Sequence, residues 1–138
     1  MDRLRLIAAG FAVALGFAAI VGYIPGLADA QGRSFGIFAL DLGDDLLHAA
    51  SALWAGVSAY LSRKASVAFL KIFGCIYGLD GLMGLTLGNG YLDFGIFTQG
   101  MQSLPLDFRI FANTPHIVLG AIGVISGFLL APRWEKRS

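Results

Sequence analysis

Four long apolar runs dominate this chain of 138 residues and limit the folds open to it. They cover about Leu6–Ile24, Leu46–Leu61, Ala65–Leu87 and Ile117–Ala131. A helix needs roughly 20 apolar residues to cross a bilayer, and in lipid the backbone must satisfy its own hydrogen bonds. The runs therefore predict an all-α fold, an integral membrane four-helix bundle that forms one domain over residues 1–138.

The composition agrees with lipid as the surrounding solvent. Hydrophobic residues make up 57% of the chain and charged residues only 14%, whereas soluble domains carry roughly 25% charged residues. The net charge of +1 argues against a nucleic-acid partner, because phosphate binding needs clustered basic residues. We expect the lipid bilayer as the main partner, and leave a homo-oligomer or a larger membrane complex open.

The distribution of positive charge predicts the orientation. One side of the membrane receives seven basic residues, namely Arg3, Arg5, Arg63, Lys64, Arg133, Lys136 and Arg137. The opposite side receives only Arg33 and Arg109. Because basic loops stay in the cytoplasm, both termini are predicted to be cytoplasmic. A cleavable signal peptide ending near Ala30 is the competing interpretation of the first run, but that run is longer than the usual ~7–15 residue core.

The sequence contains a repeat. Residues 68 positions apart match in order, as in the pairs Gly10 and Gly78, Gly16 and Gly84, Gly22 and Gly90, Tyr23 and Tyr91, and His48 and His116. The segment FGIF also occurs twice, at 35–38 and 94–97. These matches predict two tandem two-helix units, about 4–62 and 68–131, related by an axis along the membrane normal. His48 and His116 would then lie at one depth, near the outer face.

These motifs resemble a known family. FGIF, DDLLHAASALWAGVSAY, IYGLDGLMGLTLG and NTPHIVLGAIGV are similar to a family of small bacterial four-helix membrane proteins that is filed as a domain of unknown function. The resemblance covers about Leu6 to Phe128 and implies a multi-pass protein of a bacterial inner (plasma) membrane. This chain departs from the family at Asp45, where asparagine is more usual, and in a longer second outer loop. The resemblance implies no activity.

The two histidines each follow a polar residue by three positions. Asp45 and Asn113 are predicted to be helix N-caps, with His48 and His116 reaching back toward them. If Pro115 is the first helical residue, Thr114 is the cap instead. The alternative is that both imidazoles face inward around a small ligand, a metal or a bis-histidine haem. A metal would need more ligands, so no metal and no cofactor are predicted, and haem is kept as an alternative.

Asp80 lies in the middle of the third apolar run. A carboxyl group within a membrane is costly and is a candidate for function. Ser51, Trp54, Ser58 and Tyr77 are its candidate partners. The alternatives are a neutral carboxyl that bonds across helices and a proton relay or substrate site.

The glycines of the last two runs follow helical spacing. The predicted packing stripes are Gly74, Gly78, Gly81, Gly84 and Gly88 in the third run and Gly120, Gly123 and Gly127 in the fourth. Small residues at this spacing let helices approach closely in lipid.

No nucleophile–base pair, metal cluster or phosphate loop is visible in the sequence, so no catalytic residue is predicted and the chain is not expected to be an enzyme. The first hypothesis is a non-enzymatic structural or accessory subunit of a membrane assembly. The second is a small-ligand or proton-coupled transporter or binding protein that uses His48, His116, Asp80 and Trp54. The third is a haem- or pigment-binding protein.

Overall fold

The computed structural model describes residues 1–40 and 42–135, so Lys136 and Arg137 of the charge pattern lie outside the described residues. These residues form helices and no strand, which confirms the all-helical prediction for this part of the chain. The elements are α1 (Arg3–Ile20), the short 3₁₀ helix η1 (Val21–Tyr23), α2 (Leu42–Leu61), α3 (Arg63–Leu87), α4 (Gly95–Gln99), α5 (Leu106–Val124), the π-helical turn η2 (Ile125–Leu130) and α6 (Ala131–Glu135).

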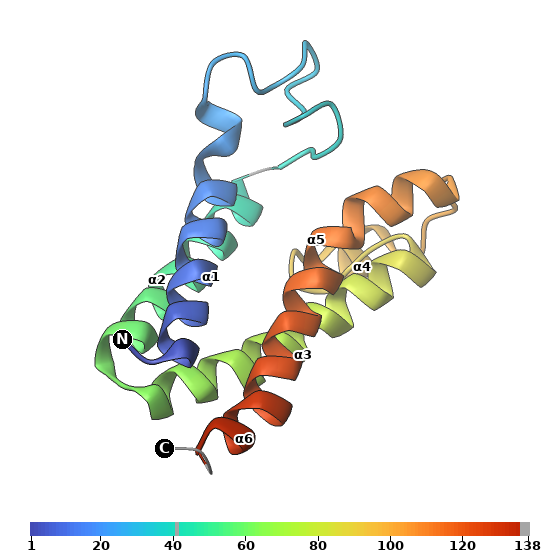
Figure 1. The fold of residues 1–138 in the computed structure, drawn as a ribbon. Coiled ribbons are helices and arrows are strands. Elements are labelled where there is room, and N and C mark those ends of the chain that lie inside the picture. The colour runs from blue at the N-terminus through green and yellow to red at the C-terminus, as the bar shows by residue number, and fades with distance from the viewer. Residues whose placement is uncertain (41, 136–138) are drawn as a thin grey trace.

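The helices pair as two antiparallel hairpins, α1 with α2 and α3 with α5 (Figure 1). In the first hairpin the Arg5 side chain donates to the carbonyl oxygens of Ala59 and Tyr60, and the Tyr23 hydroxyl donates to Asp45 at the other end. The two hairpins converge at the end that holds both termini and diverge toward the long connections (Figure 1).

An aromatic core joins the hairpins at the converging end. The Phe11 ring of α1 packs edge-on against the rings of Phe69 and Phe73 of α3, with centroids 5.7 and 5.2 Å apart. Tyr77 stacks on Phe73 at 3.9 Å and extends the row toward the middle of the molecule. Burial of these large rings is the main apolar contribution to the contact between hairpins.

The turn between the hairpins is a single residue. Ser62 separates α2 from α3, and its hydroxyl oxygen accepts from the backbone N–H of Ala65 at 3.0 Å, as a helix N-cap does. Buried Ser66 donates back to the carbonyl oxygens of Ser58 and Ser62. These bonds satisfy backbone groups that would otherwise be unpaired where the two helices meet.

Glycines form the seam between α3 and α5. A Cβ atom on Gly74 would lie 2.5 Å from the backbone nitrogen of Val124, and one on Gly123 would lie 2.7 Å from the Cα atom of Gly74. A Cβ atom on Gly120 would clash with the Cα and nitrogen atoms of Gly78, whereas one on Gly78 would lie 3.6 Å from the Cα atom of Gly120, an ordinary contact distance. The two backbones are therefore in direct contact at the middle of the predicted stripes, and at Gly74, Gly120 and Gly123 a side chain larger than hydrogen does not fit.

The last long helix begins earlier than predicted. α5 starts at Leu106, so Asn113 and Pro115 lie inside it and Asn113 does not cap it. The Asn113 side-chain amide donates to the carbonyl oxygen of Arg109, and the Thr114 hydroxyl donates to that of Ile110. These bonds back onto the preceding turn are typical of polar residues in a helix interior.

The other predicted cap is also wrong. Asp45 lies in the first turn of α2, which starts at Leu42, and its carboxylate accepts from Tyr23. An acidic residue in a first turn interacts favourably with the helix dipole without being the cap.

Three helical segments are long and apolar enough to cross a membrane: Arg3–Tyr23, Arg63–Leu87 and Leu106–Trp134. Their outward faces carry large apolar side chains, such as Val13 at 74% exposure and Leu79 at 60%. Exposed apolar surface of this extent is typical of helices that face lipid. The chain therefore has the features of a helical membrane protein.

Two folded connections close the diverging end. In the first, Asp29 accepts from the backbone and side chain of Arg33. In the second, Gln102 donates its backbone N–H to the carbonyl oxygen of Leu87, which folds the segment after α3 back over the helix end. Phe35 and Phe94, the first residues of the two FGIF segments, both have positive φ angles, 55° and 62°.

Candidate functional site

A cavity of about 800 Å³ lies between the two hairpins at their diverging end. Its walls come from the last turns of α1, the first turns of α2, the second half of α3, the first half of α5 and both connections. The apolar lining includes Leu15, Ala18, Phe35, Phe38, Phe108 and Leu119. Ligand sites typically have this size and this mainly apolar lining.

Asp80 and His116 form the central polar contact of the cavity. Asp80 is almost fully buried on α3, and its Oδ2 atom lies 2.7 Å from Nδ1 of His116 on α5. Its Oδ1 atom accepts from the backbone N–H groups of Tyr91 and Leu92, at 2.7 and 2.8 Å. Three donors thus converge on one carboxylate, which satisfies a group that would otherwise be costly to bury.

This contact leaves one side of the His116 ring available. If Asp80 is ionised and the imidazole is neutral, His116 donates from Nδ1, and its Nε2 atom carries a lone pair. A carboxylate on one ring nitrogen orients the imidazole and makes the other nitrogen a better acceptor or ligand. No hydrogen bond to Nε2 of His116 is seen among the described residues.

His48 faces the same space from the other hairpin. Its ring centroid lies 6.3 Å from that of His116, at an interplanar angle of 74°. His48 is only 8% exposed, and its Nδ1 atom makes no hydrogen bond of full geometry among the described residues, although the ring interacts with the backbone of Asp44. A buried polar atom without a partner is uncommon in folded proteins and calls for a ligand or water to complete it.

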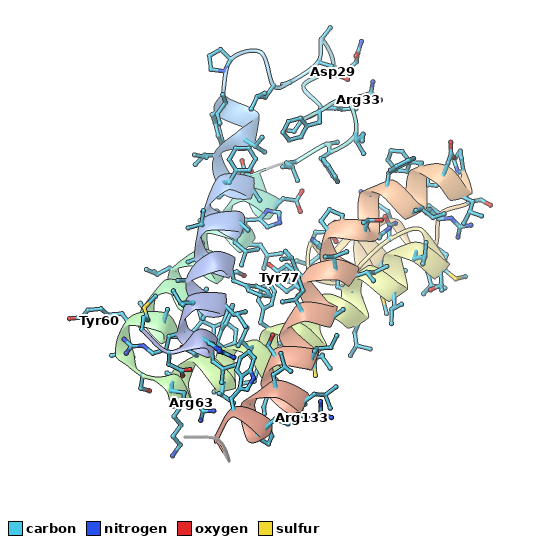
Figure 2. The ribbon with its side chains drawn as sticks, in the orientation of Figure 1. Asp29, Arg33, Tyr60, Arg63, Tyr77 and Arg133 are labelled. Atoms are coloured by element: carbon cyan, nitrogen blue, oxygen red, sulfur yellow. The ribbon has the colours of Figure 1, made fainter. Side chains whose placement is uncertain are left out.

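Tyr77 separates the polar region from the aromatic core and lies between the hairpins (Figure 2). Its hydroxyl shares a hydrogen bond of 2.9 Å with Ser51 of α2, and its ring centroid is 5.0 Å from that of His116. Below the cavity, the Tyr91 hydroxyl donates to the carbonyl oxygen of Ile76 at 2.6 Å. Burial, with the nearby Asp80 carboxylate, raises the pKa of Tyr91, which keeps this donor protonated.

The cavity lining is acidic. Asp44, Asp80 and Asp93 contribute carboxyl groups, and no lysine or arginine lines the cavity in the part of the chain that the structure describes. The basic side chains Arg63 and Arg133 lie at the opposite end, near the termini (Figure 2). The field inside the cavity therefore favours positive charge.

The structure brings His48, His116 and Asp80 together but not Trp54. The Trp54 ring packs edge-on against Phe69 at 5.0 Å, near the aromatic core, and does not line the cavity. Trp54 lies six residues after His48, which turns it about 240° around the helix and moves it about 9 Å along the axis. Of the partners suggested for Asp80, Ser51 bonds to Tyr77 and Ser58 bonds through its carbonyl to Ser66.

The partner of Asp80 was missed by the sequence analysis, as were Asp44 and Asp93 of the lining. The sequence did contain a signal for the contact between Asp80 and His116. Once Gly78 is set against Gly120 in an antiparallel pair, Asp80 comes within about one helical turn of His116. Nothing in the sequence indicates that the 88–94 segment folds back to donate two N–H groups to Asp80.

A metal site is not supported by the donors present. No group of three or more histidine, cysteine, aspartate or glutamate side chains in a suitable arrangement occurs among residues 1–40 and 42–135. What the arrangement offers is two imidazoles, one held by a carboxylate, at the floor of an apolar cavity. This set can accept or donate hydrogen bonds and can exchange a proton.

No protein-family model, no curated protein and no solved structure matches this chain. The family resemblance of the sequence stays a prediction.

Proposed function

We propose that this chain is a four-pass membrane protein that binds a small molecule in the cavity between its two hairpins. The observation that carries the proposal is the cavity floor, where buried His48 has an unpartnered nitrogen opposite the Asp80–His116 pair. A polar ligand in the cavity could complete this nitrogen, and burying it without a partner costs roughly 1–3 kcal/mol. The position of this nitrogen in the floor of a cavity favours ligand binding over the structural hypothesis.

The fourth pass is α2. It is less apolar than the three segments that qualify as spans by composition, since it carries Asp44, Asp45 and His48 in its first two turns. It nevertheless runs antiparallel to α1 over its length, from the Tyr23–Asp45 contact to the Arg5–Ala59 contact. If α1 crosses the bilayer, α2 crosses with it.

The distribution of basic residues supports cytoplasmic termini in a bacterial inner membrane. Arg63 forms an ion pair with Asp2 at 3.1 Å and donates to the carbonyl oxygen of Ala131, so the basic residues gather at the end that holds both termini. The cavity is at the other end and would open to the outer face.

A tandem duplication is supported by burial, with a corrected spacing. The buried residues of α1 each lie 62 positions before a buried residue of α3, as Phe11 and Phe73 or Leu15 and Tyr77 illustrate. The spacing of 68 relates the histidines of α2 and α5 but does not carry over to the first helices. With the spacing of 62, Ala18 corresponds to Asp80, and both line the cavity. His48 thus lacks the carboxylate that His116 has.

Binding is tested with two hydrophobic probes, tetraphenylphosphonium and triphenylphosphine oxide, on the protein in nanodiscs, with empty nanodiscs subtracted. We expect saturable binding of one or both. Ala18→Phe fills the cavity and should weaken binding by about tenfold or more, whereas Val13→Phe on the lipid-facing side should not change it. If neither probe binds saturably, or if the two variants behave alike, the proposal is wrong.

A further inference from the structure

The charge of the cavity restricts the ligand that the proposed site can take. Asp44, Asp80 and Asp93 line it, two imidazoles complete its polar lining, and none of the lining residues described is a lysine or arginine. An anionic group bound here would meet carboxylates and find no permanent positive charge. Desolvating an anion without a counter-charge is costly, so carboxylates, phosphates and sulfonates are disfavoured.

The hydrogen-bonding groups agree with a positive ligand. While Asp80 is ionised and the imidazole is neutral, His116 donates Nδ1–H to the carboxylate and presents a lone pair at Nε2. His48 is 8% exposed and has an unpartnered Nδ1 atom, and its neutral ring always offers one nitrogen as an acceptor. One buried and one half-buried acceptor near a carboxylate suit a ligand that donates N–H groups or carries a diffuse positive charge.

The walls indicate what else the ligand contains. Phe35, Phe38 and Phe108 line the cavity with aliphatic residues around them. Aromatic faces attract cations through their quadrupole and also bury apolar groups. A cavity of about 800 Å³ accommodates an organic molecule of this kind rather than a bare ion.

We infer that the ligand is an organic cation with an apolar body, whose charge lies near Asp80 and Asp44 and whose body contacts the phenylalanine walls. The inference rests on the proposed function, because it names the ligand class of the same cavity. Asp80 and Asp44 are then specificity-determining residues for charge, and the walls determine size.

The test compares three probes of similar shape that differ in charge. Binding of tetraphenylphosphonium, triphenylphosphine oxide and tetraphenylborate is measured by equilibrium dialysis against the full chain in zwitterionic nanodiscs, with empty nanodiscs subtracted. We expect the cation to bind about tenfold more tightly than the neutral oxide, and the anion to show no saturable binding.

Charge-removing variants assign the preference to the cavity. Asp44→Asn and Asp80→Asn should each weaken binding of the cation about tenfold more than they weaken binding of the oxide. Asp107→Asn removes the same charge from an exposed position that does not line the cavity, and should have no effect. Melting curves establish whether each variant is folded. If Asp80→Asn is not folded, the result for Asp44→Asn decides whether the cavity carboxylates determine the preference for a cation.

Two results would overturn the inference while the proposed function stands. One is saturable binding of the borate or the oxide as tight as that of the cation. The other is unchanged cation binding in the folded variants. If no probe binds saturably, the proposed function fails together with the inference.

Discussion

At the scale of single residues, Asp80 is the group on which the cavity depends. It accepts from His116 and from two backbone N–H groups of the segment that follows α3. It therefore positions a side chain of α5 and folds the second connection at the same time. Its burial is compatible with the membrane interior because all three contacts are made within the protein.

Removing this carboxyl should destabilise the protein strongly. We expect Asp80→Ala to lower the free energy of unfolding by about 3–5 kcal/mol, because it leaves buried donors unpaired. Thermal unfolding in detergent measures the change. Asp107→Ala is the matched control and should change stability by less than about 1 kcal/mol. Similar melting curves for the two variants would show that the Asp80 contacts are not maintained in the membrane protein.

Cation binding should also depend on pH. The titratable groups that face the ligand are Asp44 and His48 of α2, Tyr77 and Asp80 of α3, Asp93 of the second connection, and His116 of α5. From α1 only apolar residues face it. Protonation of an imidazole adds positive charge and removes an acceptor, so affinity for tetraphenylphosphonium should fall as the pH is lowered from about 8 to about 5. His48→Gln should flatten this dependence, and an affinity that rises toward acidic pH would contradict the cation assignment.

At the scale of helices, apolar length predicted four helices well and polar residues predicted their ends poorly. α1 and α3 lie within a few residues of the expected bounds. The start of α5 was misplaced because Asn113, Thr114 and Pro115 are common at helix starts. Here the two polar side chains bond back to the preceding turn instead, and the apolar residues after Pro105 extend the helix.

The close contact between α3 and α5 at their glycines predicts a loss of stability when a side chain is added there. A Cβ atom at Gly120 would clash with the Cα and nitrogen atoms of Gly78, which cannot move without separating the helices. Gly120→Ala should therefore lower the free energy of unfolding by about 1–3 kcal/mol.

Gly10 of α1 is the matched control, since nothing lies within 4 Å of a Cβ atom placed there. Gly10→Ala should leave stability unchanged or raise it slightly, because alanine has the higher helix propensity. Thermal unfolding of both variants in one detergent provides the comparison. Equal effects of the two substitutions would mean that α3 and α5 are not in backbone contact.

At the scale of the whole molecule, the fold class was readable from the sequence and the site was not. Hydropathy predicts helices because lipid imposes that structure on any apolar run. The site depends on the register between α3 and α5 and on how a connection folds back, and neither is a local property of the sequence. The sequence singled out both histidines and Asp80, but the direct contact between His116 and Asp80 required the structure.

The proposed topology can be tested with single cysteines in a Cys75→Ser background. Gln31 lies in the first connection and Lys64 beside the turn between hairpins, and both are exposed. A membrane-impermeant thiol reagent added to intact cells should label Gln31→Cys and should reach Lys64→Cys only after permeabilisation. The opposite labelling pattern would mean that the protein has the inverse orientation, with the cavity on the cytoplasmic side.

The glycine seam has a mechanical consequence. α3 and α5 touch through their backbones, so this hairpin behaves as a single stiff rod. The contacts of the other hairpin with it include the turn residue Ser62, the aromatic rings and the Asp2–Arg63 ion pair at the converging end, and the Ser51–Tyr77 hydrogen bond. A small rotation of the first hairpin about the converging end would widen the cavity most at the diverging end. It would change the contacts at the converging end least.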